Sequence, residues 1–215
     1  MDEKEQYRRA LDALRRGGIV AVPTDTVYGL IAVGDDDAAV ERIYATKVRD
    51  PAQPMPLFVG SIAQAELIAE MNAAARRLAA RFWPGALTIV LPKKPSFRTR
   101  AAAGGDTIGV RVPDDPFLIE AALQLGPLTG TSANIAGRKE CHTAAEVRAQ
   151  LGDAPPGGGP PDGGVDLIVD APVRATGLPS TIVDCTDPRR VRVVRVGALA
   201  VEPIREVLGD AFPLD

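Results

Sequence analysis

Short apolar runs alternate with amphipathic segments along most of this chain, and that alternation constrains its fold more than any other feature. A helix is predicted over residues 3–16, because their apolar side chains fall on one helical face. Gly17-Gly18 would end that helix. Residues 19–22 and 27–33 are apolar runs short enough to be buried strands. Strands that alternate with helices are typical of the α/β class, and the strand-rich last third predicts a mixed sheet.

The remaining elements follow from apolar runs and from side chains that can cap a helix. Strands are predicted at 57–59, 86–91, 107–112, 166–169, 180–183 and 191–196. Helices are predicted to begin near Asp36 or Asp37, Ser61 with Gln64, Asn72, Asp115 with Pro116, and Thr143 with Glu146. A short last helix is predicted after Glu202.

We expect a single domain over residues 1–215, since this length suits one domain and 46% apolar residues supply a sizeable core. Residues 152–164, GDAPPGGGPPDGG, predict a mobile loop within that domain, because only short strands follow them. The net charge of −3 argues against a protein that coats nucleic acid, although a local basic patch stays open.

The start of the chain and its apolar runs predict a cytoplasmic protein without membrane contact. The first residues are charged, with no apolar run behind them, and no apolar stretch approaches the ~20 residues that span a bilayer. Cys141, Cys185 and the one histidine, His142, fall short of the roughly four ligands of a structural zinc site, so we expect no metal site. The phosphate-binding patterns GxxxxGK[ST] and GxGxxG are both absent, so a nucleotide would need another kind of site.

Polar clusters stand at the ends of several predicted strands, where α/β sheets commonly bind ligands. The first contains Thr24, Asp25 and Thr26, directly after an apolar run. The same residues could equally form a turn that bonds to its own backbone. The hydroxyl-rich segments 129–134 and 179–184 have the same placement, and the small residues of 129–134 would let the backbone approach a ligand closely.

Several cations also lie at predicted element ends. Lys47 and Arg49 close a helix before a proline-rich run, so they could reach one polyanion or could only complement the helix C-terminus. Arg111 lies between two valines in a strand and either extends to solvent or points into a polar pocket. Arg195 ends a valine-rich strand. Trp83, in contrast, is better explained as a structural turn residue than as a ligand contact.

Taken together, eight short motifs resemble the YrdC family of threonylcarbamoyl-AMP synthases. They are PTDTVYGL at 23–30, KVR at 47–49, PMPLFV at 54–59, FWPGALTIVL at 82–91, TIGVRVP at 107–113, TSANIAG at 131–137, PSTIVD at 179–184 and RVG at 195–197. Each motif is short, but eight of them in order cover nearly the whole chain. The resemblance implies a YrdC-like twisted mixed sheet with flanking helices around a large, open, partly basic cavity.

The resemblance also implies a reaction. L-threonine and bicarbonate give a threonine carbamate, which attacks the α-phosphorus of ATP and yields threonylcarbamoyl-AMP and pyrophosphate. Mg²⁺ would accompany ATP, held largely by phosphates and water. A separate threonylcarbamoyl transferase complex would then modify adenosine beside the anticodon of certain tRNAs, and direct contact with tRNA stays open.

Residue roles follow from the same resemblance. Lys47 and Arg49 would neutralise ATP phosphates and are the expected catalytic residues. Thr26 and Arg111 would line the threonine pocket, with Arg111 on the α-carboxylate and Ser180 or Thr181 on the hydroxyl. The remaining expected ATP-binding residues are Gln53, Thr107, Thr131, Ser132, Asn134 and Arg195.

The chain departs from the family pattern at three places. Asp50 and Gln53 stand where the family commonly has Pro and then Lys or Asn, and Lys139-Glu140 stand where it often has Pro-Ser. Longer relatives also carry a second C-terminal domain. A non-catalytic, nucleotide- or RNA-binding paralogue is therefore the alternative function, and a carbamoyl transferase segment of hydrogenase maturation is another. The presence of Lys47, Arg49, Ser132, Asn134 and Arg195 favours catalysis.

Overall fold

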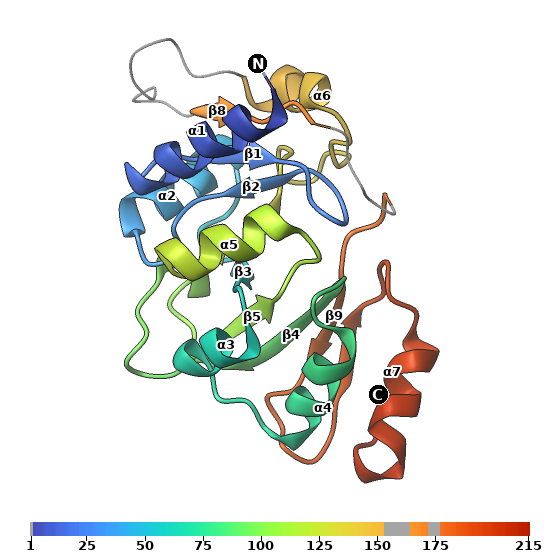
Figure 1. The fold of residues 1–215 in the computed structure, drawn as a ribbon. Coiled ribbons are helices and arrows are strands. Elements are labelled where there is room, and N and C mark those ends of the chain that lie inside the picture. Colours follow the sequence, from blue (N-terminus) through green and yellow to red (C-terminus); the bar gives the residue numbers. More distant parts are fainter. Residues whose placement is uncertain (1, 153–163, 172–176) are drawn as a thin grey trace.

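The computed structural model describes residues 2–152, 164–171 and 177–215 (Figure 1). Helices and strands alternate over most of this length, as the α/β prediction requires. In chain order the elements are α1 Glu3–Arg15, β1 Val20–Val22, β2 Gly29–Ile31, α2 Asp37–Lys47, β3 Leu57–Phe58, α3 Ile62–Ile68, α4 Ala73–Phe82, β4 Leu87–Pro92, the 3₁₀ turn Arg100–Ala102, β5 Thr107–Arg111, α5 Pro116–Leu125, β6 Leu128–Thr129, β7 Thr131–Ser132, α6 Ala144–Leu151, β8 Leu167–Ile168, β9 Thr181–Asp184, β10 Arg192–Arg195, α7 Val201–Leu208 and the 3₁₀ turn Gly209–Ala211.

The strands form two mixed sheets, where the sequence led us to expect one. The smaller sheet has the order β7-β2-β1-β8, and the larger has the order β10-β9-β4-β5-β3-β6. After β1 the chain turns and returns antiparallel as β2, while β8 pairs parallel to the other side of β1. Both sides of β1 are thereby used within the smaller sheet. The larger sheet assembles around β4, which pairs antiparallel with β5 and parallel with β9.

Side-chain caps set most of the helix starts where the sequence predicts them. Asp36, Asn72 and Asp115 each accept a hydrogen bond from a backbone N–H in the first turn of α2, α4 and α5. Thr143 and Glu146 form the complete predicted capping box at α6.

The prediction for α3 is only half right. Ser61 caps the helix, but the Gln64 side chain accepts from the backbone N–H of Gly60 rather than completing the box. The last helix begins at Val201, one residue before the predicted Glu202, and has no side-chain cap.

Helices α4 and α7 lie side by side along the larger sheet in the lower part of Figure 1. Leu78 of α4 and Ile204 of α7 are fully buried in the same core cluster. Trp83, directly after α4, is also buried, and its Nε1 donates to the Leu87 carbonyl oxygen at 2.7 Å. The structural interpretation of this tryptophan is therefore confirmed.

The mobile loop predicted at 152–164 lies almost entirely outside the described residues. Within the described part of the chain, no helix combines the length and the apolar character that crossing a membrane requires.

Candidate functional site

A polar cavity of about 200 Å³ lies where the two sheets meet. Both sheets contribute to its wall, and so do the loops that follow β1, α2 and β7. Its lining residues are Thr24, Thr26, Val27, Gly29, Arg49, Pro54, Pro56, Phe58, Arg111, Gly130, Thr131, Ser132, Glu140, Pro179, Ser180, Ile182 and Arg195. Seven of the eight motifs that the sequence singled out contribute lining residues here, and residues 82–91 do not. The cavity is smaller than the large one that the resemblance implies.

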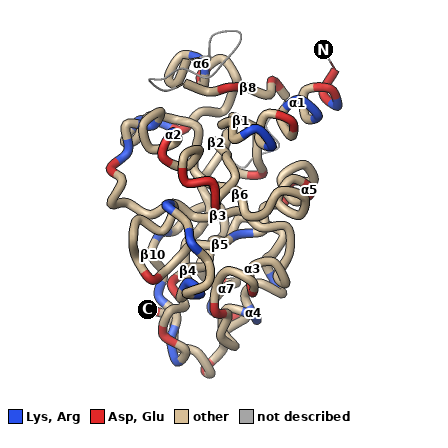
Figure 2. The backbone as a smooth tube through the Cα atoms, turned by 90° about the vertical axis from the view of Figure 1, so that its left-hand side faces the viewer, with Lys and Arg blue, Asp and Glu red and all other residues tan. Residues whose placement is uncertain are grey.

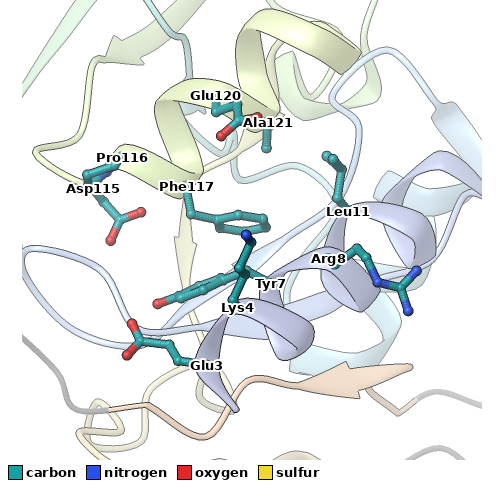
Figure 3. Close-up of a pocket in the computed structure, with 10 residues that line it drawn as sticks. All are labelled: Glu3, Lys4, Tyr7, Arg8, Leu11, Asp115, Pro116, Phe117, Glu120 and Ala121. Atoms are coloured by element: carbon teal, nitrogen blue, oxygen red, sulfur yellow. The ribbon is translucent and has the colours of Figure 1, made fainter. Parts of the chain in front are cut away.

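A larger cavity, of about 610 Å³, lies elsewhere, between α1 and α5 (Figure 3). Its floor carries Tyr7 and Phe117, whose rings lie 4.6 Å apart. Its rim carries charges of both signs, and Figure 2 shows acidic and basic residues alternating along α1. None of the predicted site residues lines it. The predicted site residues therefore gather at the smaller cavity between the sheets and not at this one.

Arg111, the last residue of β5, points into that cavity rather than to solvent. Its side chain is 3% exposed, and Nε and Nη1 donate to the Gly85 carbonyl oxygen at 2.8 Å and to Thr26 Oγ1 at 3.2 Å. Nη2 donates to Asp25 Oδ1, and the guanidinium lies over the Phe58 ring. Burial lowers the pKa of Arg111, and Asp25 opposes that shift. The position of Arg111 is consequently held by four different groups.

The turn after β1 confirms the local-turn interpretation of the Thr24–Thr26 cluster and also places two of its residues at the cavity. Thr24 Oγ1 donates to the Val27 carbonyl oxygen at 2.7 Å and accepts from the Thr26 backbone N–H at 3.0 Å, which are local turn bonds. Thr24 and Thr26 also line the cavity. Because the turn is held from within, Thr26 presents its hydroxyl to Arg111 in a defined position.

Lys47 lies behind the cavity wall. It ends α2 and is 1% exposed, and its Nζ donates to the backbone carbonyl oxygens of Ser132 and Asn134, the latter at 2.6 Å. Burial, and then the charge of Arg49, lower its pKa to about 8. The Asn134 amide donates to the carbonyl oxygens of Ile135 and Arg138, whereas its buried Oδ1 has no hydrogen-bond partner among the described residues. Buried polar atoms normally have a hydrogen-bond partner, so Asn134 Oδ1 still lacks a donor.

Arg49 and Arg195 line the cavity, and both are partnered by neutral groups. Arg49 donates to the Pro54 carbonyl oxygen at 2.9 Å, and Arg195 donates to the Ser180 carbonyl oxygen at 2.9 Å. Burial lowers the pKa of both guanidinium groups. Neither residue forms an ion pair within the described ranges of the chain. Their charges therefore remain available to an anion in the cavity.

Ser180 and Thr181, the two residues predicted to bind the substrate hydroxyl, have different surroundings in the structure. Ser180 lines the cavity, with its Oγ 2.9 Å from Thr88 Oγ1. Thr181 does not line it: its buried Oγ1 donates to the Leu199 carbonyl oxygen and accepts from the N–H groups of Gly197 and Leu199. With three bonds already made, Thr181 fixes the turn that follows β10. Of the two residues, only Ser180 faces the cavity.

Three further predicted residues do not line the cavity: Asn134, whose bonds are given above, Thr107 and Gln53. Thr107 is exposed at the start of β5, at the opposite end of that strand from Arg111, because a strand advances about 3.3 Å with each residue. Gln53 is exposed and contributes only its backbone carbonyl oxygen, which accepts from the Tyr44 hydroxyl at 2.9 Å. Thr131, Ser132 and Thr26 line the cavity as predicted.

Three residues that shape the site or bring charge to it were not among the predicted site residues. Phe58 packs under Arg111, and a side chain at Gly130 would collide with its ring at 2.7 Å. Asp25 pairs with Arg111, and Glu140 lines the cavity. Asp25 and Phe58 belong to quoted motifs, and Glu140 is a noted departure from the family pattern. The signals were present in the sequence, but no pairing could be derived from them.

Comparisons with known proteins identify the family of the chain. Residues 12–197 match the family model Sua5_yciO_yrdC, described as "Telomere recombination". The chain is 35% identical to the threonylcarbamoyl-AMP synthase of Bacillus subtilis over 95% of this chain and 57% of that protein. It is also 35% identical to the threonylcarbamoyl-AMP synthase of Chromohalobacter salexigens, over 85% of this chain and 94% of that protein.

A solved structure, of P. abyssi Sua5 complexed with L-threonine, has the same fold. It superposes with a TM-score of 0.85 at 33% identity, and the match covers 100% of this chain and 60% of that one. The chain thus spans somewhat more than half the length of its B. subtilis and P. abyssi relatives. With the family model matched over most of its length, the chain belongs to the Sua5/YciO/YrdC family.

Proposed function

We propose that this chain is an L-threonylcarbamoyladenylate synthase, which forms threonylcarbamoyl-AMP and pyrophosphate from L-threonine, bicarbonate and ATP. The observation that carries the proposal is the cavity between the sheets, where guanidinium groups and hydroxyls from both sheets face one space. Relatives named threonylcarbamoyl-AMP synthase, and a relative whose structure contains L-threonine, support it.

The phosphates of ATP would bind to the cations that have only neutral partners. Arg49 and Arg195 reach the cavity directly, and a phosphate oxygen would replace the backbone carbonyls to which they now donate. Lys47 supplies a third positive charge from behind the wall, through the β7 segment to which it is bonded. The Asn134 side chain, with its unpaired Oδ1, would complete its hydrogen bonds with a donor from the nucleotide or from water.

L-Threonine would bind beside Arg111. A guanidinium has five N–H groups, and Arg111 uses three of them on Gly85, Thr26 and Asp25. Two remain for the α-carboxylate of the amino acid. Ser180 would read the substrate hydroxyl, since it is the member of the Ser180–Thr181 pair that faces the cavity.

The chemistry needs positioning more than it needs a general base. The carbamate is already an anion, so its oxygen forms a bond to the α-phosphorus while the bond from that phosphorus to the pyrophosphate oxygen breaks. Arg49 and Arg195 would neutralise the charge that builds up on the leaving pyrophosphate.

Mg²⁺ would supply further neutralisation when it accompanies ATP. Within the described residues, no group of three or more His, Cys, Asp or Glu could hold a metal ion. We therefore propose that phosphate oxygens and water provide most of its ligands, as Mg²⁺ commonly requires.

The product would pass to a separate threonylcarbamoyl transferase complex, which places the threonylcarbamoyl group on N6 of adenosine in tRNA. We place this work in the cytoplasm, where ATP, threonine and tRNA are available. A direct contact between this chain and tRNA is part of the proposal only as a hypothesis, because the net charge of −3 gives no general affinity for nucleic acid.

The decisive experiment is an assay for product with purified protein, ATP, L-threonine and bicarbonate. An AMP-linked threonylcarbamoyl product and equimolar pyrophosphate are expected, and omission of threonine or bicarbonate should abolish both. An Arg205→Ala variant, changed on the exposed face of α7, serves as the matched control and should retain full activity. Binding of ATP without any product, under conditions where a known relative is active, would favour the non-catalytic paralogue.

A further inference from the structure

Glu140 is the carboxylate that lines the otherwise basic cavity. It lies in the segment between β7 and α6, and its side chain is partly exposed. Among the described residues, no hydrogen bond or ion pair satisfies this carboxylate. It faces the same small space as Arg49 and Arg195, whose own partners are neutral carbonyl groups.

The backbone on both sides of Glu140 is anchored. The carbonyl oxygen of Lys139 accepts a hydrogen bond from the Gln150 side chain of α6 at 3.0 Å. On the other side, the carbonyl oxygen of the fully buried Cys141 accepts from the backbone N–H of Tyr28 at 3.0 Å. Glu140 is therefore a fixed part of the cavity wall rather than a side chain on a free loop.

The negative charge of Glu140 acts on two cations of the site, Arg195 and Lys47. Its charge raises the pKa of Arg195 and of Lys47, opposing the larger effect of burial at each. A sphere of the cavity's volume is about 7 Å across, less than the Debye length of about 8 Å at physiological ionic strength. Salt would therefore screen the repulsion between Glu140 and an anion bound between Arg49 and Arg195 only in part.

That repulsion depends on the charge of the ligand. A free triphosphate carries about twice the negative charge of its magnesium complex, because the divalent cation neutralises two of its charges. A carboxylate beside the phosphate site therefore penalises the metal-free ligand much more than the metal-bound one. It can also attract the metal ion directly.

We propose that Glu140 is a specificity-determining residue, which makes this cavity favour a polyphosphate bound as its magnesium complex over the same polyphosphate without metal. The proposal rests on the proposed function for the identity of the polyphosphate, ATP. In this proposal, Glu140 discriminates between ATP with and without magnesium. Arg49, Arg195 and Lys47 attract the phosphates.

The test compares dissociation constants for ATP measured by calorimetry with excess Mg²⁺ and with a chelator. Inorganic pyrophosphate is measured in the same two conditions, so that the phosphate site can be tested without the nucleoside. In Glu140→Gln, metal-free ATP and pyrophosphate should bind about 3- to 10-fold more tightly, the range expected for removing one nearby solvent-accessible charge. The magnesium complex, with about half the charge, should gain about half as much free energy, so the ratio of the metal-free to the magnesium dissociation constant should fall by about 2- to 3-fold.

Matched variants separate charge from shape. Glu140→Asp keeps the charge and should largely keep the wild-type ratio, whereas Glu140→Ser, which introduces the residue that the family often has here, should behave like Glu140→Gln. Glu206→Gln removes an exposed charge from α7 and should leave every constant unchanged. Since no hydrogen bond to the Glu140 carboxylate is lost, these variants are expected to fold, and thermal melting verifies it.

The outcomes for Glu140 and for the proposed function can be told apart. An unchanged ratio in both Glu140→Gln and Glu140→Ser would overturn the role of Glu140 and leave the synthase proposal intact. The second outcome is that the protein does not bind ATP, while Glu140→Gln still lowers the ratio of the metal-free to the magnesium dissociation constant for pyrophosphate. This outcome would contradict the synthase proposal and support the role of Glu140. Absence of binding by either ligand to the wild-type protein would overturn both.

Discussion

Asp25 and Arg111 form an ion pair that is almost completely removed from solvent, with side chains 12% and 3% exposed. The pair joins the turn after β1 of the smaller sheet to the end of β5 of the larger sheet. A guanidinium buried in this way needs its carboxylate, because an unpaired buried charge is strongly destabilising.

Asp25→Ala should therefore lower the free energy of unfolding by about 3 kcal/mol or more, the usual scale when one partner of a buried pair is removed. Urea denaturation followed by circular dichroism measures this. Asp12→Ala serves as the control: it removes two solvent-accessible pairs on α1, with Arg8 and Arg15, and should change the same quantity by less than about 1 kcal/mol. Equal effects of the two substitutions would contradict a buried, structurally required pair.

Arg49→Ala should reduce turnover by at least about 100-fold, the scale for losing a charge-assisted contact to a reacting phosphate. The guanidinium has no carboxylate partner among the described residues, so its removal leaves no buried anion, and the fold should be little affected. Initial rates of pyrophosphate release at saturating substrates give the measurement. A near-normal rate would refute the assignment of Arg49 to the phosphates.

L-Valine should be a poor substrate compared with L-threonine. If Ser180 bonds to the substrate hydroxyl, valine removes one hydrogen bond from that buried group and leaves it only its contact with Thr88, and kcat/KM should fall at least about 100-fold. Ser180→Ala should reduce the discrimination mainly by lowering kcat/KM for threonine. Equal kcat/KM for the two amino acids with the wild-type protein would exclude a site for the hydroxyl.

Phosphate binding should weaken as the pH rises through about 8. Lys47 has a pKa of about 8, lowered chiefly by burial, so it is an ammonium below that pH and a neutral amine above it. A bound polyphosphate favours the ammonium, so a fraction of a proton, about half at pH 8 and more at higher pH, should be taken up on binding. Calorimetry in buffers of different ionisation enthalpy detects this uptake. Lys47→Met should bind more weakly at pH 7 and lose the proton uptake.

Much of the local structure could be predicted because its causes are local. Asp36, Asn72 and Asp115 cap their helices through bonds to residues three positions away, and such bonds can be derived from spacing alone. The division into two sheets could not be derived, because it depends on which distant strand takes each side of β1. Neither apolar content nor strand length distinguishes β8 from the other candidates for that place.

The site shows the same division between local and distant causes. The motifs correctly bring Arg49, Arg111 and Arg195 together, but a motif does not say which of its residues faces inward. Thr107 and Arg111 belong to one motif and stand at opposite ends of one strand. Ser180 and Thr181 are neighbours with different surroundings, because successive residues of an extended chain point to opposite sides.

The cavity between the two sheets also bears on how the protein folds. Its wall draws on residues from Thr24 to Arg195, so it exists only after segments far apart in sequence have come together. Contacts of such long range are slow to form, and the site should be among the last features to appear during refolding. A ligand that bridges the sheets would bind to the native state and not to partly assembled ones, and would therefore slow unfolding by holding the two sheets together.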